Sequence, residues 1–457
     1  MLAPLANRTY RNLFAAQVIA LFGTGLTTVA LTLLAYEIAG ARAGIVLGTA
    51  LALKMIAYVA VAPLAGAFAH RLPRRRLLVT LDVVRAGVVL CLPFVTTVWQ
   101  IYVLIFVVNA CSAVFTPVFQ ATIPDVLEDE ASYTRALSLS RLAYDLENLL
   151  SPGAAALALL VMSYDALFVA NALAFGASAL LVAAVAIPPS AEPERTGPFA
   201  QSVAFGLNIY LRTPRLRGLL ALSLAVACAG AMMIVNTVVL VRERFGGSEA
   251  ETAFAFAAGG AGSMVVALVL PRMLERLADR PLMLGGGVML TAGLACGLVA
   301  SELVWLLWIW FLLGAGSSLI QTPAGRLLRR SCREGDRAAV FSSQFALSHL
   351  CWLITYPLAG LSGVHLGIGS TFAMLSVVCL AAVAIAARLW PRGDPLVVEH
   401  DHPALSHDHL HVHDEHHQHE HEGWEGPEPH RHPHRHERLR HRHAFVIDLH
   451  HPWWPRA

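Results

Sequence analysis

The amino-acid sequence predicts an all-α membrane protein with twelve transmembrane helices in two six-helix bundles, followed by a disordered cytoplasmic tail. Hydrophobic residues make up 56% of the 457-residue chain, and charged residues only 14%. Twelve apolar stretches between Leu13 and Ala387 are each long enough to cross about 30 Å of hydrocarbon as a helix. The arginines are concentrated in alternate connections between these stretches, which is typical of multi-pass membrane proteins.

The expected spans contain glycine and proline, which membrane helices tolerate where neighbouring groups satisfy the backbone. The first apolar run is too long for a cleavable signal peptide, so it is interpreted as the first span. The twelve spans are expected over residues 13–36, 44–68, 77–96, 101–120, 138–161, 166–187, 217–241, 252–271, 282–300, 304–322, 340–362 and 366–387.

The orientation follows from the arginines. With the N-terminus in the cytoplasm, the connections on the opposite side carry only Arg42, Arg242 and Arg244 of the arginines that precede the tail. This asymmetry is the positive-inside pattern. We therefore expect both termini in the cytoplasm and the protein in a bacterial inner membrane.

The chain divides into two halves of six spans. A polar, proline-rich stretch separates them, and each half has a basic turn between its second and third spans. Such internal symmetry is typical of transporters built from repeats. The expected domains are an N-terminal bundle over 1–187, a cytoplasmic linker over 188–216, a C-terminal bundle over 217–390 and a histidine-rich tail over 391–457.

The tail from His400 to Ala457 holds 18 of the 21 histidines of the chain. Neutral imidazole is a good ligand for nickel, copper, zinc and cobalt, and most of these rings are unprotonated at cytoplasmic pH. The segment has too few apolar residues to bury a core, so we expect disorder without metal. The candidate metal ligands are His400, His402, His407, His409, His411, His413, His416, His417, His419, His421, His430, His432, His434 and His436.

The two histidine blocks of the tail differ in their charged residues. Aspartates and glutamates accompany the first block and could add oxygen ligands, whereas arginines accompany the second block, which should therefore hold cations less well. The alternative interpretation is a solvated low-complexity tail or an added purification tag. A tag would normally be an unbroken run of histidine, and this segment alternates histidine with charge over its length.

Several motifs resemble the major facilitator superfamily. The turn from Gly66 to Arg76 is similar to its loop motif G-x-L-A-D-R-x-G-R-R, although His70 stands in place of aspartate and Pro73 in place of glycine. The segments 82–86, 123–125 and 135–138 look like the branch that contains macrolide and siderophore exporters. Together with the histidine-rich terminus, the whole chain is similar to the nickel-resistance exporters of this superfamily.

The resemblance implies two six-helix bundles around a central cavity that opens to alternate sides of the membrane. It also implies that the basic loop holds the bundles in one conformation. The loop residues concerned are His70, Arg71, Arg74, Arg75 and Arg76. Asp82 and Arg85 lie one helical turn apart next to this loop, and a structural charge pair is favoured over a transport site for them.

Candidate transport residues are the polar groups that a membrane penalises. A charged side chain at a span centre costs about 2.5–3.5 kcal/mol on insertion scales, so Lys54, Asp145 and Glu147 require partners or a water-filled cavity. Lys54 is either a charge that competes with protons or cargo, or a snorkelling or structurally paired lysine. Asp145 is either a cation ligand or proton acceptor, or the partner of Arg141. His349 is a further candidate, because an intramembrane imidazole is uncommon without a polar role.

Softer metal ligands occur on the seventh span. Cys228, Met232 and Asn236 are spaced four residues apart, so they share one helix face. Such a stripe is more often membrane packing than a coordination site. Both interpretations remain open at the level of sequence.

The hypothesis for function is a secondary exporter of divalent transition metals, nickel first and cobalt second, driven by proton antiport. Moving a dication out against 100 mV costs about 4.6 kcal/mol, and the only lysine, Lys54, lies outside any phosphate-binding loop motif. The alternatives are an exporter of organic compounds with a metal-responsive tail, and a non-transporting sensor or store. The expected partners are the metal, protons and the lipid bilayer, with no nucleic acid, no required cofactor, no enzyme activity and a monomeric state.

Overall fold

The structure of the chain is a computed structural model. It describes residues 1–68, 72–189, 199–394, 397–402, 405–411, 430–436, 439–447 and 454. His70 and Arg71 of the basic loop lie outside these ranges, as do the tail histidines His413, His416, His417, His419 and His421.

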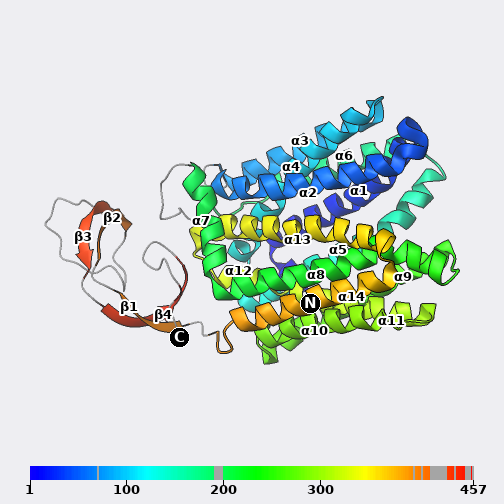
Figure 1. Cartoon of the computed structure of the whole chain (residues 1–457). Helices are drawn as coiled ribbons and strands as arrows, with labels where there is room; N and C mark the ends of the chain where they lie inside the picture. Colours follow the sequence, from blue (N-terminus) through cyan, green and yellow to red (C-terminus); the bar gives the residue numbers. More distant parts are fainter. Residues whose placement is uncertain are drawn as a thin grey trace.

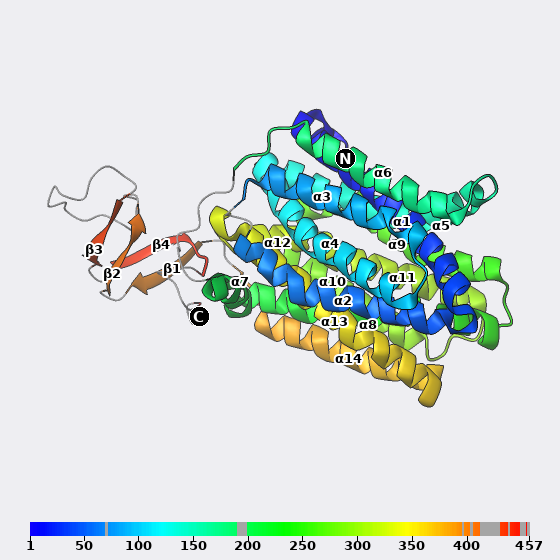
Figure 2. The same cartoon turned by 90° about the horizontal axis from the view of Figure 1, so that it is seen from above.

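The membrane body consists of long helices that run along a common direction (Figures 1 and 2). In the first half these are α1 (Arg8–Ala39), α2 (Ala43–Phe68), α3 (Arg74–Leu90), α4 (Val98–Val126), α5 (Glu130–Leu159) and α6 (Tyr164–Ala183). In the second half they are α8 (Pro214–Val239), α9 (Glu249–Arg276), α10 (Asp279–Cys296), α11 (Leu303–Gln321), α13 (Arg337–His365) and α14 (Ile368–Leu389). Two shorter helices, α7 (Phe199–Arg212) and α12 (Ala324–Arg330), complete the helical body.

Each expected span coincides with one of the twelve long helices in the described part of the chain, so the prediction of an all-α membrane fold is confirmed. Ten of the described helices are long and apolar enough to cross a membrane by length and composition. α5 and α10 fall outside this set, because α5 carries Arg141, Asp145 and Glu147 and α10 begins with Asp279 and Arg280. Both nevertheless pack among the other spans.

The helices form two groups whose contacts follow the repeat. Within the first group α1 and α3 pack on α6, and α2 packs on α4; within the second, α9 and α10 pack on α11, and α8 packs on α14. Between the groups, α2 contacts α13 and α5 contacts α9. In both cases the second helix of one half meets the fifth helix of the other. We call these two contacts between the halves, α2 with α13 and α5 with α9, the seams. The two seams are related by the internal symmetry that the sequence shows.

One end of the bundle is formed by the α2–α3, α4–α5, α9–α10 and α11–α13 connections, and we call it the arginine-rich end. Figure 1 shows α7 and the tail at this end. After α14 the chain is held here, because Asp394 pairs with Arg330 (3.1 Å) and Arg215 (3.5 Å). Near the C-terminus, Trp454 lies 5.0 Å from the guanidinium of Arg215, and Phe445 is buried. Both ends of the tail thus contact the same part of the helical body.

The described parts of the tail form two small antiparallel sheets (Figure 1). β1 (Val397–His402) pairs with β4 (Leu439–Ala444), and β2 (Leu405–His411) pairs with β3 (His430–His436). The sequence analysis expected no regular structure in this tail. The His-x-His spacing of this segment matches the two-residue period of a β-strand.

Small residues allow α9 and α11 to approach closely, as is usual between membrane helices. A Cβ atom added to Gly262 would lie 1.9 Å from the Phe311 carbonyl oxygen. A Cβ atom added to Gly314 would lie 1.9 Å from the Gly259 carbonyl oxygen. Gly260 faces open space. The contact between these helices therefore depends on the glycines of one face of α9.

We expect Gly262→Ala to lower the thermal unfolding midpoint of the protein in detergent, because overpacking a well-packed interface costs about 1–3 kcal/mol. Gly260→Ala is the matched control on the same helix. It should leave the midpoint unchanged or raise it, since alanine favours helix over glycine by about 0.5–1 kcal/mol. Equal midpoints for the two variants would contradict the close approach of α9 and α11.

Candidate functional site: a central polar cavity

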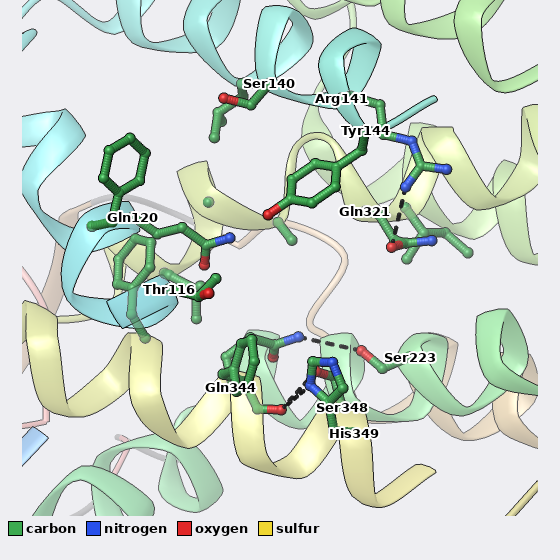
Figure 3. A pocket seen from close by; sticks show the side chains of 18 of the residues that line it. Thr116, Gln120, Ser140, Arg141, Tyr144, Ser223, Gln321, Gln344, Ser348 and His349 are labelled. Carbon is green, nitrogen blue, oxygen red and sulfur yellow. Dashed lines mark hydrogen bonds between the residues drawn. The ribbon is translucent and has the colours of Figure 1, made fainter. Parts of the chain in front are cut away.

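A cavity of about 490 Å³ lies between the two halves of the helical body. Its walls come from α1, α2, α4 and α5 of the first half and from α8, α11, α12 and α13 of the second. Figure 3 shows Ser140, Arg141 and Tyr144 on one side and Ser223, Gln344, Ser348 and His349 on the other. The location is the one expected for a substrate between two rocking bundles.

The cavity lining is polar for a site inside a membrane. Three of its residues carry formal charge, Lys54, Arg141 and Asp145. Amide and hydroxyl side chains supply most of the remaining polar groups, namely Gln17, Tyr58, Thr116, Gln120, Tyr133, Ser140, Tyr144, Asn148, Ser223, Gln321, Gln344 and Ser348. Such groups can replace part of the hydration shell of a polar solute.

Arg141 and Asp145 occupy the seam between α5 and the second half. The Arg141 guanidinium pairs with Asp145 Oδ1 at 3.2 Å and donates to Ser263 on α9 (2.8 Å) and to Gln321 on α11 (3.3 Å). Asp145 Oδ2 is buried and has no hydrogen-bond partner among the described residues. The pair with Arg141 is the second of the two interpretations of Asp145 from the sequence, and its remaining oxygen can accept a further hydrogen bond.

His349 on α13 has one ring nitrogen committed to the backbone. Its Nδ1 lies 2.7 Å from the Phe345 carbonyl oxygen. A carbonyl oxygen only accepts, so Nδ1 carries the hydrogen and the neutral ring keeps its lone pair on Nε2. The ring packs edge-on against Tyr58 of α2 at 4.8 Å between centroids. This second contact fixes the ring across the seam between the halves.

Lys54 lies close to both His349 and Glu147. Lys54 lines the cavity with its Nζ 5.7 Å from the Tyr58 ring centre, and it is near enough to interact electrostatically with both Glu147 and His349. Glu147 is half-buried where α5 packs on α1, since a Cβ on Gly25 would lie 2.7 Å from its Oε1. It is not among the residues that line the cavity. The structure thus gathers Lys54, Asp145, Glu147 and His349 in or beside one region.

The arginine-rich end of the cavity is closed by ion pairs between the halves. Asp125 at the end of α4 accepts from Arg74 of α3 and from Arg337 of α13, with one carboxylate oxygen for each. Arg326 of α12 pairs with Glu130 (2.8 Å) of the first half. These contacts join the halves on one side of the cavity, so this conformation is closed at the arginine-rich end.

Two further contacts strengthen this closure. Arg326 donates to Thr134 (2.7 Å), and Arg329 donates to the Glu128 carbonyl oxygen (2.6 Å). Tyr133 of α5 approaches Gly325, where an added Cβ would lie 2.7 Å from its hydroxyl oxygen. The short helix α12 is therefore the part of the second half that covers this end.

The basic-loop residues occupy different environments. Arg74 is buried in the network of Asp125, whereas Arg75 and Arg76 are exposed. Asp82 and Arg85 form a buried ion pair inside the first half, where Ser178 of α6 donates to Asp82 (2.7 Å). The Arg85 guanidinium lies between two aromatic rings, with its central carbon 4.1 Å from the ring centre of Phe115 and 4.5 Å from that of Phe175. This environment matches a structural pair that joins α3, α4 and α6.

The stripe of softer ligands on α8 lies away from the cavity. Cys228, Met232 and Asn236 are buried and are not among the residues that line it. Asn236 donates to the Ala359 carbonyl oxygen (3.3 Å) and approaches the Met232 sulfur (3.5 Å). In this conformation the stripe packs α8 against α13, which is the packing interpretation of its helical spacing.

Sequence reasoning missed the residues that close the cavity and most of its polar lining. Asp125 and Arg337 are the main examples, followed by Tyr58, Tyr144 and Gln344. Isolated glutamines inside apolar spans are the signal that could have identified part of this set. The charges at the helix ends gave no such signal, because any loop of a membrane protein carries similar residues.

Two helical bundles of six spans, joined by symmetric seams around a polar cavity, define a multi-pass membrane transporter. The model of the Major Facilitator Superfamily matches residues 13–241 and 220–411. The chain belongs to this superfamily, whose members are generally transporters and not enzymes.

A curated relative supports the same assignment. The chain is 24% identical over 332 residues to the uncharacterized MFS-type transporter YfiS of Bacillus subtilis, covering 69% of this chain and 77% of the relative.

Solved structures share the fold at low sequence identity. The human organic anion transporter MFSD10 matches with a TM-score of 0.72 at 13% identity, covering 83% of this chain and 99% of its own. A variant of the fucose:proton symporter FucP of E. coli matches with a TM-score of 0.65 at 15% identity, covering 84% of this chain and 98% of the symporter. A bacterial homologue of the iron transporter ferroportin in its outward-facing state matches with a TM-score of 0.67 at 15% identity, covering 83% of this chain and 98% of the homologue.

We expect Asp125→Asn to favour conformations that are open at the arginine-rich end, because it removes the charge that neutralises Arg74 and Arg337. Cys332 reports this change, since it is buried beside Tyr133 of the other half. Maleimide modification of Cys332, followed by mass spectrometry, should become about tenfold faster for each 1.4 kcal/mol of destabilisation.

The matched control is Arg75→Gln, which changes an exposed charge of the same loop. It should leave the modification rate of Cys332 unchanged. Exposed Cys296 near the opposite end serves as the internal standard. An unchanged rate in Asp125→Asn would show that this network does not control the opening.

Proposed function

We propose that the protein is a secondary exporter of divalent transition-metal cations, nickel first and cobalt second, driven by proton antiport. The observation that carries the proposal is the donor set of the cavity. Asp145 presents a buried oxygen without a protein partner among the described residues, and His349 keeps Nε2 available. Carboxylate and imidazole are suitable ligands for these ions. Water and neighbouring amides would complete the coordination shell.

The charges near the cavity favour exchange with protons. A dication leaving against the membrane potential costs about 2.3 kcal/mol per charge per 100 mV, so an exchange for two protons is electrically neutral. Asp145, Glu147 and His349 are the groups that would take protons when the ion leaves. Lys54 adds a fixed positive charge beside Glu147 and His349, which would weaken metal binding and aid release.

The proposed orientation places the arginine-rich end and the tail in the cytoplasm of a bacterial cell. The tail histidines would then gather ions near the end through which the cavity loads, raising their local concentration. The present conformation, closed at that end, corresponds to a state after loading. Release would follow on the opposite side of the membrane.

An exporter of organic compounds is the second candidate. The observation in its favour is the lining of amides and aromatic side chains around Lys54, which also suits an organic anion or polar solute. In that case the tail would sense metal instead of delivering cargo.

We expect Asp145→Asn to lower the initial rate of nickel uptake into everted membrane vesicles under an imposed pH gradient by at least about tenfold, because one ligand of the ion is lost. Met232→Leu is the control, since Met232 is buried away from the cavity. His349→Gln should behave like Asp145→Asn. Cobalt, zinc and copper are measured in parallel to order the metals.

The same vesicles should be tested with a fluorescent organic cation, an organic anion and a siderophore. Metal uptake that depends on Asp145 supports the proposal. If the vesicles accumulate an organic solute but none of the metals, the metal-export proposal is wrong and the second candidate replaces it.

Deleting residues 400–457 should weaken nickel resistance without abolishing transport. The reason is that the tail concentrates ions and the cavity moves them. Uptake rates measured over a range of nickel concentrations should show a raised KM and a nearly unchanged maximal rate. Complete loss of uptake in correctly inserted protein would make the tail an essential part of the pathway.

A further inference from the structure

The two histidine blocks of the tail face each other in antiparallel register. In the pair β2–β3, His407 lies opposite His434, His409 opposite His432 and His411 opposite His430. Successive residues of a strand alternate between the two faces of a sheet, and directly opposed residues share a face. By register, all six histidines therefore fall at positions that belong to one face of this ladder.

The second pair of strands repeats the arrangement. In β1–β4, His400 lies opposite His441, while Val398 opposes His443 and His402 opposes Leu439. By the same alternation, the four histidines of this ladder also fall at register positions of one face. The His-x-His spacing of the sequence thus becomes a histidine face in each sheet.

The opposite face of β1–β4 carries complementary charges. Glu399 opposes Arg442 and Asp401 opposes Arg440. Opposite charges directly across an antiparallel pair stabilise it by about 0.2–1 kcal/mol, and a slip of one residue would exchange the faces. The acidic character of the first block and the basic character of the second therefore favour the register that brings the histidines together.

We propose that the tail holds its metal ions between the two histidine blocks, with one imidazole from each block per ion and the ions stacked along the ladder. The proposal deepens the tail's part in the proposed function and rests on it. In this arrangement the second histidine block supplies as many ligands as the first. Its arginines alone would instead suggest that it binds metal more weakly.

The dimensions of a sheet suit this arrangement. Directly opposed residues have Cβ atoms about 4.5–5.5 Å apart, and metal–imidazole nitrogen bonds are about 2 Å long, so two opposed imidazoles can bind one ion. Pairs two residues apart along a strand are separated by about 6.8 Å. Two imidazoles leave most of the coordination shell to water, so each ion would remain exchangeable and available to the cavity.

The test measures nickel bound to the full-length protein in detergent by equilibrium dialysis. One variant removes histidines of β2 (His407→Ala, His409→Ala and His411→Ala), and a second removes their partners in β3 (His430→Ala, His432→Ala and His434→Ala). Each should lose the same number of tightly bound ions. The combined variant should lose no more than either alone, because each site needs both strands.

The matched control replaces three histidines outside the described residues, His416→Ala, His417→Ala and His419→Ala. It should keep the ions of the ladder. Losses that simply add, so that the combined variant loses twice as many ions as either strand variant, would overturn the ladder and leave independent ligands on a flexible chain.

Charge reversal gives an independent arm. Glu399→Arg with Asp401→Arg should weaken nickel binding, and adding Arg440→Asp with Arg442→Glu should restore it by re-forming the cross-strand pairs. Failure of this rescue would contradict the register. Nickel transport in vesicles is measured separately: intact transport with additive binding losses refutes the ladder alone, whereas absent metal transport refutes the proposed function and leaves the binding result standing.

Discussion

The whole arrangement depends on pairing charges inside a protein that is surrounded by lipid. Asp125 is central to this pairing, because it neutralises arginines from both halves, Arg74 and Arg337. Removing one partner of such a network leaves a buried charge uncompensated, which costs several kcal/mol. The halves can therefore separate at this end only when water or another ion replaces the lost partners. The ion pairs thus link opening of the cavity to hydration of its entrance.

The helices were predictable from sequence because the apolar length of a span is a local property. The structure adds residues to most span ends, because the helices extend beyond the apolar stretches to capping residues such as Asn7 and Asp129. The resemblance implied that the basic loop with Arg74 holds the bundles in one conformation, but the partners that join the two halves were not predictable. The pair of Asp125 and Arg337 joins residues 212 positions apart, and a single sequence contains no signal for such a contact.

The site candidates illustrate a second limit. Charged residues inside spans, such as Lys54 and Asp145, do line the cavity, because lipid excludes them from the outer surface. The spacing of Cys228 and Met232 correctly places them on one helix face, but spacing cannot tell which face of an apolar helix looks into the cavity. Packing of α8 against α13 determines that, and it depends on the tertiary fold.

The middle of the membrane contains the bonds that must be exchanged when the cavity changes sides. Arg141 has partners in both halves. Asp145 belongs to the same half as Arg141, whereas Ser263 and Gln321 belong to the other half. Rocking of the halves therefore breaks some of these contacts. A cation bound at Asp145 would weaken the attraction between Asp145 and Arg141, since both positive charges compete for one carboxylate. Under the proposed function, occupancy of the cavity and the strength of the contact between α5 and the second half would be coupled through Asp145, so that the cargo would influence the conformation that releases it.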